Sequence, residues 1–94
     1  MDRIIISQHV EDVCTNVQGC RLYYQLKPYF DRKEVVSVSF TGLNPMSSSF
    51  FNSSFGELID NYGSDNFKQT IRLINIPKNQ VDLIRGYLKF HFEK

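Results

Sequence analysis

The sequence lacks several features that mark whole classes of protein. It has no tryptophan, only two cysteines, and no apolar run near the ~20 residues that a membrane-spanning helix needs. Its 11 basic residues nearly balance its 10 acidic ones, so the net charge of +1 provides no surplus of positive charge to attract nucleic acid. No signal peptide is visible at the start of the chain. We therefore expect a cytoplasmic protein that binds neither membranes nor nucleic acid.

The common catalytic and cofactor-binding motifs are also absent. We find no GxSxG nucleophile elbow, no HExxH, no P-loop and no GxGxxG. Cys14 and Cys20 lie six residues apart with no histidine close enough to complete a zinc set, and we expect two reduced thiols. The adjacent carboxylates Glu11 and Asp12 fit a solvated loop. The sequence therefore predicts a protein that is not an enzyme and needs no cofactor or metal.

What the sequence does contain is typical of one small folded domain over residues 1–94. Apolar residues make up 41% of the chain and charged residues 22%, which is ordinary globular usage. Eight phenylalanines and five tyrosines must supply much of the volume of the core. A chain of 94 residues buries one modest core rather than two.

Residue periodicity predicts three strands and three helices. The strands are expected at residues 3–7, 34–40 and 69–76, where β-branched or alternating apolar residues occur. The helices are expected at 16–32, 48–62 and about 79–94, and residues 64–68 are expected to form a short connection. The fold class is therefore α/β, with a mixed or parallel sheet of three to four strands, about three helices and the order β-α-β-α-β-α.

Single residues carry more local predictions. Either Thr15 or Asn16 is a candidate N-cap of the first helix, and Gly63 is a natural C-cap of the second helix. Gly19 predicts a close approach of another element to the first helix. Pro28 predicts a kink near residue 27, or an end of the helix there.

The stretch from residue 34 to 62, EVVSVSFTGLNPMSSSFFNSSFGELIDNY, organises the chain as strand, loop and helix. Its helix opens on Ser47, Ser48 and Ser49, any of which can cap the first turn. A phosphate on a serine at this position would be stabilised by the partial positive charge of the helix N-terminus. Plain capping explains the three serines equally simply, so the residues alone leave both interpretations open.

This stretch resembles the STAS superfamily, whose best-known members are bacterial anti-sigma-factor antagonists. The closer similarity is to a STAS-like domain family of unassigned function, through VVSVSFTGLNPMSSSFFNSSFGELIDNYG. Upstream, QGCRLYYQL resembles the glycine–arginine helix start of that family, at Gly19 and Arg21. Downstream, TIRLINIPKNQVDLIRGYL resembles its last strand and helix. The resemblance covers about residues 15–90.

The resemblance implies a regulatory module that binds a protein partner. In the antagonists a kinase phosphorylates a serine at the start of this helix, and that position falls on Ser49, with Ser48 beside it. Ser47 stands where the antagonists carry an acid, and Phe50 where they carry glycine. The implied partner is a histidine-kinase-type ATPase or a regulator that it controls. The expected contact residues are Asn44, Met46, Ser47, Phe50 and Asn52.

Two other hypotheses remain open at this point. The helix N-terminus is a candidate cradle for an anion, which predicts a small-ligand or nucleotide-binding domain. Alternatively, the apolar run RIIIS at residues 3–7, or the phenylalanine-rich helix, pairs two copies of the chain as a homodimer.

Overall fold

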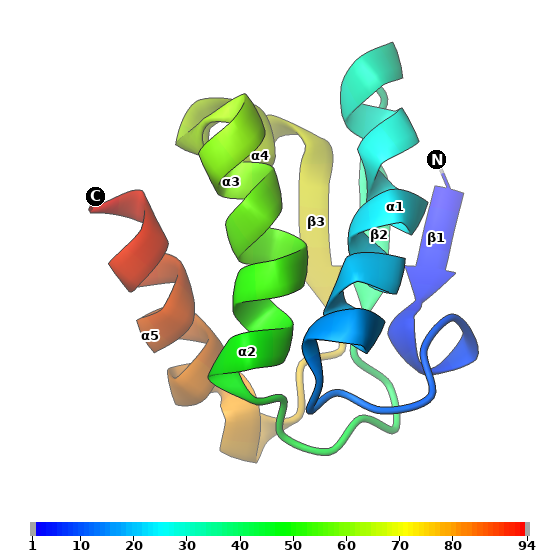
Figure 1. The fold of residues 1–94 in the computed structure, drawn as a ribbon, viewed down its shortest axis with the longest axis vertical. Coiled ribbons are helices and arrows are strands. Elements are labelled where there is room, and N and C mark those ends of the chain that lie inside the picture. The colour runs from blue at the N-terminus through cyan, green and yellow to red at the C-terminus, as the bar shows by residue number, and fades with distance from the viewer. Residues whose placement is uncertain (1, 94) are drawn as a thin grey trace.

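The computed structural model describes residues 2–93 as a layer of helices on one face of a parallel sheet (Figure 1). The strands are β1 (Asp2–Ile5), β2 (Val36–Ser39) and β3 (Ile71–Ile74), in the spatial order β1-β2-β3. The helical segments are η1 (Ile6–Gln8), α1 (Asn16–Arg32), α2 (Ser48–Phe51), η2 (Asn52–Gly56), α3 (Glu57–Tyr62), α4 (Ser64–Thr70), η3 (Lys78–Gln80) and α5 (Val81–Phe92). The α/β class is thus as predicted, and the sheet is parallel throughout.

The strand order explains why the helices share one side of the sheet. Connections between parallel strands are almost always right-handed. Because the strands follow one another in chain order, both crossovers then place their helices on the same face. Figure 1 shows α1, α2 and α3 in front of the strands, with α5 beside them in the same layer.

The core lies between this helical layer and the sheet. Its largest fully buried side chains are dominated by phenylalanine, as the composition predicts: Phe40, Phe50, Phe51 and Phe55. Gly19 of α1 confirms the predicted close approach, because a Cβ there would lie 2.7 Å from the carbonyl oxygen of Phe50. Thr15 caps α1 by accepting a hydrogen bond from the amide of Gln18, and Gly63 ends α3 with φ of +90°.

The predicted bounds of the first helix, 16–32, are confirmed, because α1 runs from Asn16 to Arg32. Of the two outcomes predicted for Pro28, an end of the helix near residue 27 was wrong. The apolar face of α1 continues past the proline to Phe30, which is buried, and the hydroxyl of Tyr29 donates to Asp2 of β1 at 3.0 Å. These contacts offset the hydrogen bond that the proline removes.

The segment before β3 is also different from its prediction. The predicted connection at 64–68 and the first two residues of the predicted strand form α4. The side-chain amide of Asn66 donates to the backbone carbonyl of Tyr62 at 2.7 Å, and the side chain of Phe67 is buried in the core. The chain therefore contains more helical segments than the three expected.

The helix after β2 is interrupted by the π-helical turn η2. The hydroxyl of Ser54 donates to the carbonyls of Phe50 and Phe51, at 2.8 and 3.3 Å, and so competes with the regular backbone bonds. Such π-turns insert one extra residue into a helix and are frequent at functional sites. Here the turn faces α1, at the same place where Gly19 makes its close contact.

Among residues 2–93, no helix combines the length and the apolar character that crossing a bilayer requires.

Candidate functional site

The candidate site is the serine loop, defined here as residues 41–49 between β2 and the first turn of α2. It is fixed to its neighbours by hydrogen bonds from distant parts of the chain. The side-chain amide of Gln80 donates to the carbonyl of Leu43 at 2.8 Å, and the hydroxyl of Tyr87 donates to that of Met46 at 3.2 Å. The amide of Ser47 donates to the carbonyl of Val13 at 2.9 Å. The loop is therefore held in one position by η3, α5 and the segment before α1.

Ser47 has a structural role at the start of α2. Its hydroxyl accepts a hydrogen bond from the amide of Phe50 at 3.1 Å and donates to the carbonyl of Cys14 at 2.9 Å. The residue that stands at the acidic position of the antagonists is thus the helix N-cap. Its hydroxyl is engaged on both sides, so Ser47 offers a partner little.

Ser48 and Ser49 follow the cap and are both exposed. Within residues 2–93, neither hydroxyl forms a hydrogen bond to the protein, and the first intrahelical bond begins only at the amide of Phe51. The amides of Ser48 and Ser49 therefore belong to the unpaired donors of the first helical turn. Asn44 is exposed on the same loop. These three residues are the exposed members of the predicted site within the loop itself.

Two predicted contact residues are not on the surface. Met46 is 2% exposed and Phe50 is fully buried, so neither side chain can contact a partner without a rearrangement of the core. The ring of Phe50 fills part of the core, and its backbone carbonyl lies against Gly19 of α1. Of the five predicted contact residues, only the polar ones remain: Asn44, Ser47 and Asn52.

Asn52 is exposed, but its side-chain oxygen lies 2.7 Å from Nε2 of His91 near the end of α5. His91 lies in the helix that the sequence predicts at about 79–94. The structure buries it, at 5% exposure, with its ring against Gly56 and 5.6 Å from the ring of Phe51. Asn52 thus connects the helix that follows the serine loop (α2, η2 and α3, called here the serine helix) to α5.

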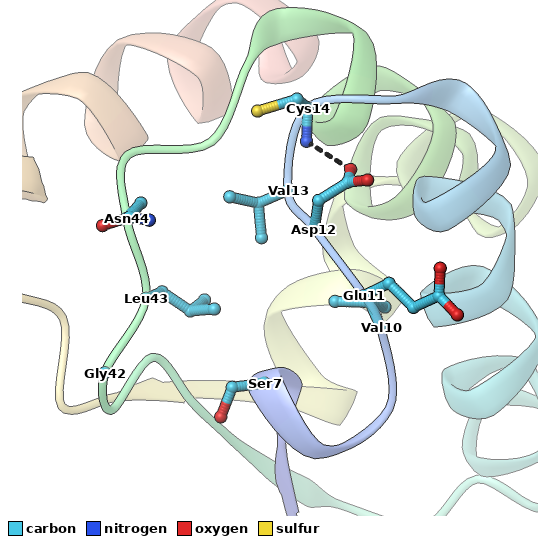
Figure 2. A pocket seen from close by; sticks show the side chains of 9 residues that line it. All are labelled: Ser7, Val10, Glu11, Asp12, Val13, Cys14, Gly42, Leu43 and Asn44. Atoms are coloured by element: carbon cyan, nitrogen blue, oxygen red, sulfur yellow. Dashed lines mark hydrogen bonds between the residues drawn. The ribbon is translucent and has the colours of Figure 1, made fainter.

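A cavity of about 240 Å³ lies beside the serine loop, at the carboxyl ends of β1 and β2 (Figure 2). It is lined by Ser7, Val10, Glu11, Asp12, Val13, Cys14, Gly42, Leu43 and Asn44. One carboxylate oxygen of Asp12 is already occupied, because it accepts from the amide of Cys14 and from the amide and hydroxyl of Thr15. Two acidic side chains in the lining make this cavity unfavourable for a nucleotide or phosphate.

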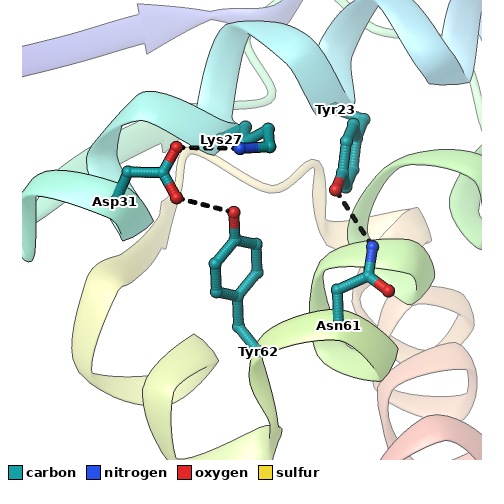
Figure 3. A network of polar contacts seen from close by, with 5 residues as sticks. All are labelled: Tyr23, Lys27, Asp31, Asn61 and Tyr62. Carbon is teal, nitrogen blue, oxygen red and sulfur yellow. Dashed lines mark hydrogen bonds and ion pairs between the residues drawn. The ribbon is translucent and has the colours of Figure 1, made fainter.

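A polar network joins α1 to α3 on the side away from the cavity (Figure 3). Asp31 accepts from Nζ of Lys27 and from the hydroxyl of Tyr62, both at 2.9 Å, and Tyr23 accepts from the side-chain amide of Asn61 at 3.0 Å. The bond to Lys27, followed by that to Tyr62, lowers the pKa of Asp31. Burial, followed by the bond to Asp31, raises the pKa of Tyr62. This network fixes the two helices that support the serine loop.

The sequence did not identify the anchors of the loop. Gln80 and Tyr87 lie 37 and 41 residues from the carbonyls that they bind. No local pattern indicates such a contact. Both cysteines are free and exposed, in accord with the expected thiols.

A three-stranded parallel sheet covered on one face, with an exposed serine pair opening the helix after its central strand, defines an α/β module of the STAS-like class. A sequence comparison specifies this class further. The model of the family described as a STAS-like domain of unknown function (DUF4325) matches residues 18–80, and the chain belongs to this family. Neither the curated proteins nor the solved structures contain a match to the chain.

Proposed function

We propose that the protein is a non-enzymatic regulatory module that binds a protein partner through the serine loop. The observation that carries the proposal is the contrast between a loop anchored from three directions and three exposed polar side chains on it, Asn44, Ser48 and Ser49. A fixed backbone lowers the entropy that ordering the loop on binding would otherwise cost. The proposed partner remains a histidine-kinase-type ATPase or a regulator under its control.

Phosphorylation of Ser49, or of Ser48, is the proposed switch. A phosphate here would add nearly two negative charges beside the unpaired amides of the first turn. It would accept hydrogen bonds from those amides and would change the charge of the surface that meets the partner. Both hydroxyls are accessible to a kinase, whereas the hydroxyl of Ser47 is engaged in capping.

The cavity beside the loop favours a small ligand less strongly. Its volume of about 240 Å³ lies below the range of roughly 300–1,000 Å³ that is usual for ligand pockets. The strand order also has no reversal, and it is at such a reversal that open α/β sheets form their ligand crevice. The anion-cradle hypothesis is therefore placed second, and a thermal-shift panel of nucleotides and phosphate tests it.

The test of the first proposal is a quantitative affinity purification from the native host, with four baits and intact-mass analysis of each. We expect a partner that the wild type and Ser49→Ala retain and that Ser49→Asp loses, together with an added phosphate mass on the wild type that Ser49→Ala abolishes. The fourth bait, Gln69→Glu, adds one negative charge at an exposed position of α4 and is the matched control for the charge of Ser49→Asp. A set of bound proteins that is identical for all baits would refute the proposal.

A further inference from the structure

Within residues 2–93, no helix covers the second face of the sheet. Fully parallel sheets are almost always covered on both faces, because their strands are rich in apolar side chains. Here the crossovers place every helix on one side, as Figure 1 shows. The residues that point away from that layer are defined here as the open face. They are Arg3, Ile5, Ser37, Arg72 and Ile74. Ser39 lies on the same side but is 1% exposed, and its hydroxyl is bonded to the side chains of Thr41 and Asn75.

The register orders this face into two rows. Arg3, Ser37 and Arg72 are aligned across the three strands, and Ile5, Ser39 and Ile74 form the next row. On the open face the central strand therefore presents the small side chain of Ser37, while the two outer strands present long or branched ones. Strands lie about 4.8 Å apart, which places the two arginine Cα atoms about 10 Å from each other.

Both arginines are exposed, and within residues 2–93 no ion pair engages either of them. No acidic residue belongs to the open face. The apolar side chains of Ile5 and Ile74 are partly exposed and do not belong to the buried core cluster. The face thus combines an uncompensated pair of positive charges with apolar area that nothing in the described chain covers.

We propose that the open face is a second interaction surface, which binds an acidic amphipathic helix of another protein. An α-helix is about 10 Å in diameter, which matches the separation of the arginines. Lying along β2, such a helix places its apolar stripe over Ser37 and between the isoleucines. Carboxylates on its two flanks then meet Arg3 on one side and Arg72 on the other.

Two other occupants fit the face less well. A second copy of the chain would bring arginine pairs toward each other with no carboxylate between them, and like charges at an interface are unfavourable. A nucleic acid would satisfy the arginines, but its phosphate backbone has no apolar surface for Ile5 and Ile74. The total charge of +1 also gives little electrostatic attraction to a polyanion.

The test uses two designed 18-residue helical peptides with the same leucine stripe, one flanked by glutamates and one by lysines. Fluorescence anisotropy at low salt should show that the glutamate peptide binds about tenfold or more tightly than the lysine peptide, as expected for two surface ion pairs. The double variant Arg3→Glu/Arg72→Glu should reverse this preference. The control Arg21→Glu/Lys89→Glu makes the same change of charge at exposed positions of α1 and α5 and should leave the preference unchanged.

Methyl NMR provides a second readout that does not depend on the variants. Addition of the glutamate peptide should shift the methyl signals of Ile5 and Ile74 and leave that of Ile84, a buried residue of α5, in place. Equal binding of the two peptides would overturn the proposal, as would shifts confined to the serine loop. Concentration-dependent shifts of Ile5 without peptide would show self-pairing instead, and displacement of the peptide by an oligonucleotide would show a nucleic-acid surface; each contradicts the proposal.

This surface is independent of the serine loop. Ser49→Asp should leave peptide binding unchanged, and Arg3→Glu/Arg72→Glu should leave the partner of the serine loop bound. Failure of either proposal is therefore distinguishable from failure of the other.

Discussion

At the scale of single residues, the helical layer depends on two glycines that other elements approach closely. Gly19 receives the backbone of α2, and Gly56 receives the ring of His91 from α5. The space around Gly86, by contrast, is open, because no heavy atom lies within 4 Å of the position where its Cβ would stand. These three positions allow packing effects to be separated from the general preference of helices for alanine.

Gly19→Ala is expected to lower the free energy of unfolding by about 1–3 kcal/mol, since the added methyl overpacks the contact between α1 and α2. The new Cβ would meet the carbonyl oxygen of Phe50 and the Cβ of Ser53, both at 2.7 Å, and one of these is backbone that cannot rotate away. Urea unfolding followed by circular dichroism measures the change. Gly86→Ala is the control and should stabilise α5 by up to about 1 kcal/mol.

Gly56→Ala tests the packing of α5 on the π-turn. Its Cβ would lie 2.6 Å from Cε1 of His91, so we expect destabilisation of about 1–3 kcal/mol. In a His91→Ala background the added methyl enters vacated space and its effect should decrease. A double-mutant cycle should give a coupling free energy of about 0.5–3 kcal/mol; additive effects of the two substitutions would contradict the contact.

At the scale of elements, the serine helix is positioned by a cap at its start and by bonds to α1 along its length. Ser47 supplies the cap and connects α2 to the segment before α1. Asp31 and Tyr62 connect α1 to the end of α3. The first of these interactions concerns the candidate site directly, and the second determines how rigidly its helix is held.

Ser47→Ala should destabilise the protein by about 0.5–2 kcal/mol, because the amide of Phe50 loses its acceptor and the carbonyl of Cys14 its donor. Ser48→Ala, one residue further along, removes an exposed hydroxyl and should change stability by no more than about 0.5 kcal/mol. Thermal unfolding of the two variants side by side gives the comparison. Equal effects would mean that Ser47 is not the cap.

The Asp31 network predicts a specific pH dependence. Because the folded state lowers the pKa of Asp31 from its ordinary 3.8, the network stabilises the fold above that pH, and the stabilisation is lost as the pH falls through the folded pKa. Lys27 is the larger cause, so Lys27→Met should raise the carboxyl pKa more than Tyr62→Phe does. Titration of the carboxyl carbon by ¹³C NMR measures both; the reverse order would be inconsistent with the geometry.

At the scale of the whole molecule, the matched family region ends at residue 80, before α5 begins. Yet α5 buries Ile84 at 1% exposure, and its aromatic residues pack on the helical layer. The ring of Tyr87 lies 5.0 Å from that of Phe51, and the ring of Phe92 lies 6.0 Å from that of Phe67. The helix is therefore part of the same core and also holds the serine loop through Tyr87.

A chain that ends after Gln80 should consequently lose its cooperative thermal transition and bind the dye ANS, because Phe51 and Phe67 become exposed. Removal of residues 93 and 94 alone is the control and should leave the transition intact. A cooperative transition in the shorter chain would show that residues 2–80 form a complete core without α5.

Local patterns in the sequence determined the elements whose causes are local. Strand β2, the helical character of residues 16–32 and 48–62, and the caps at Thr15 and Gly63 follow from side-chain period and from backbone groups a few residues away. The close approach at Gly19 was also predictable, because a glycine inside an amphipathic helix needs a packing reason. The serine opening of the helix after β2 was recognisable because an N-cap acts on amides only two or three residues away.

Only the tertiary structure decided which of these residues reach the surface. The burial of Met46 and Phe50, the anchoring of the serine loop by Gln80 and Tyr87, and the helical state of α4 depend on contacts between segments far apart in the chain. Such contacts have no periodic signature, since they arise from how whole elements pack. The open face of the sheet has the same origin, because it follows from strand order and crossover handedness rather than from any single stretch of sequence.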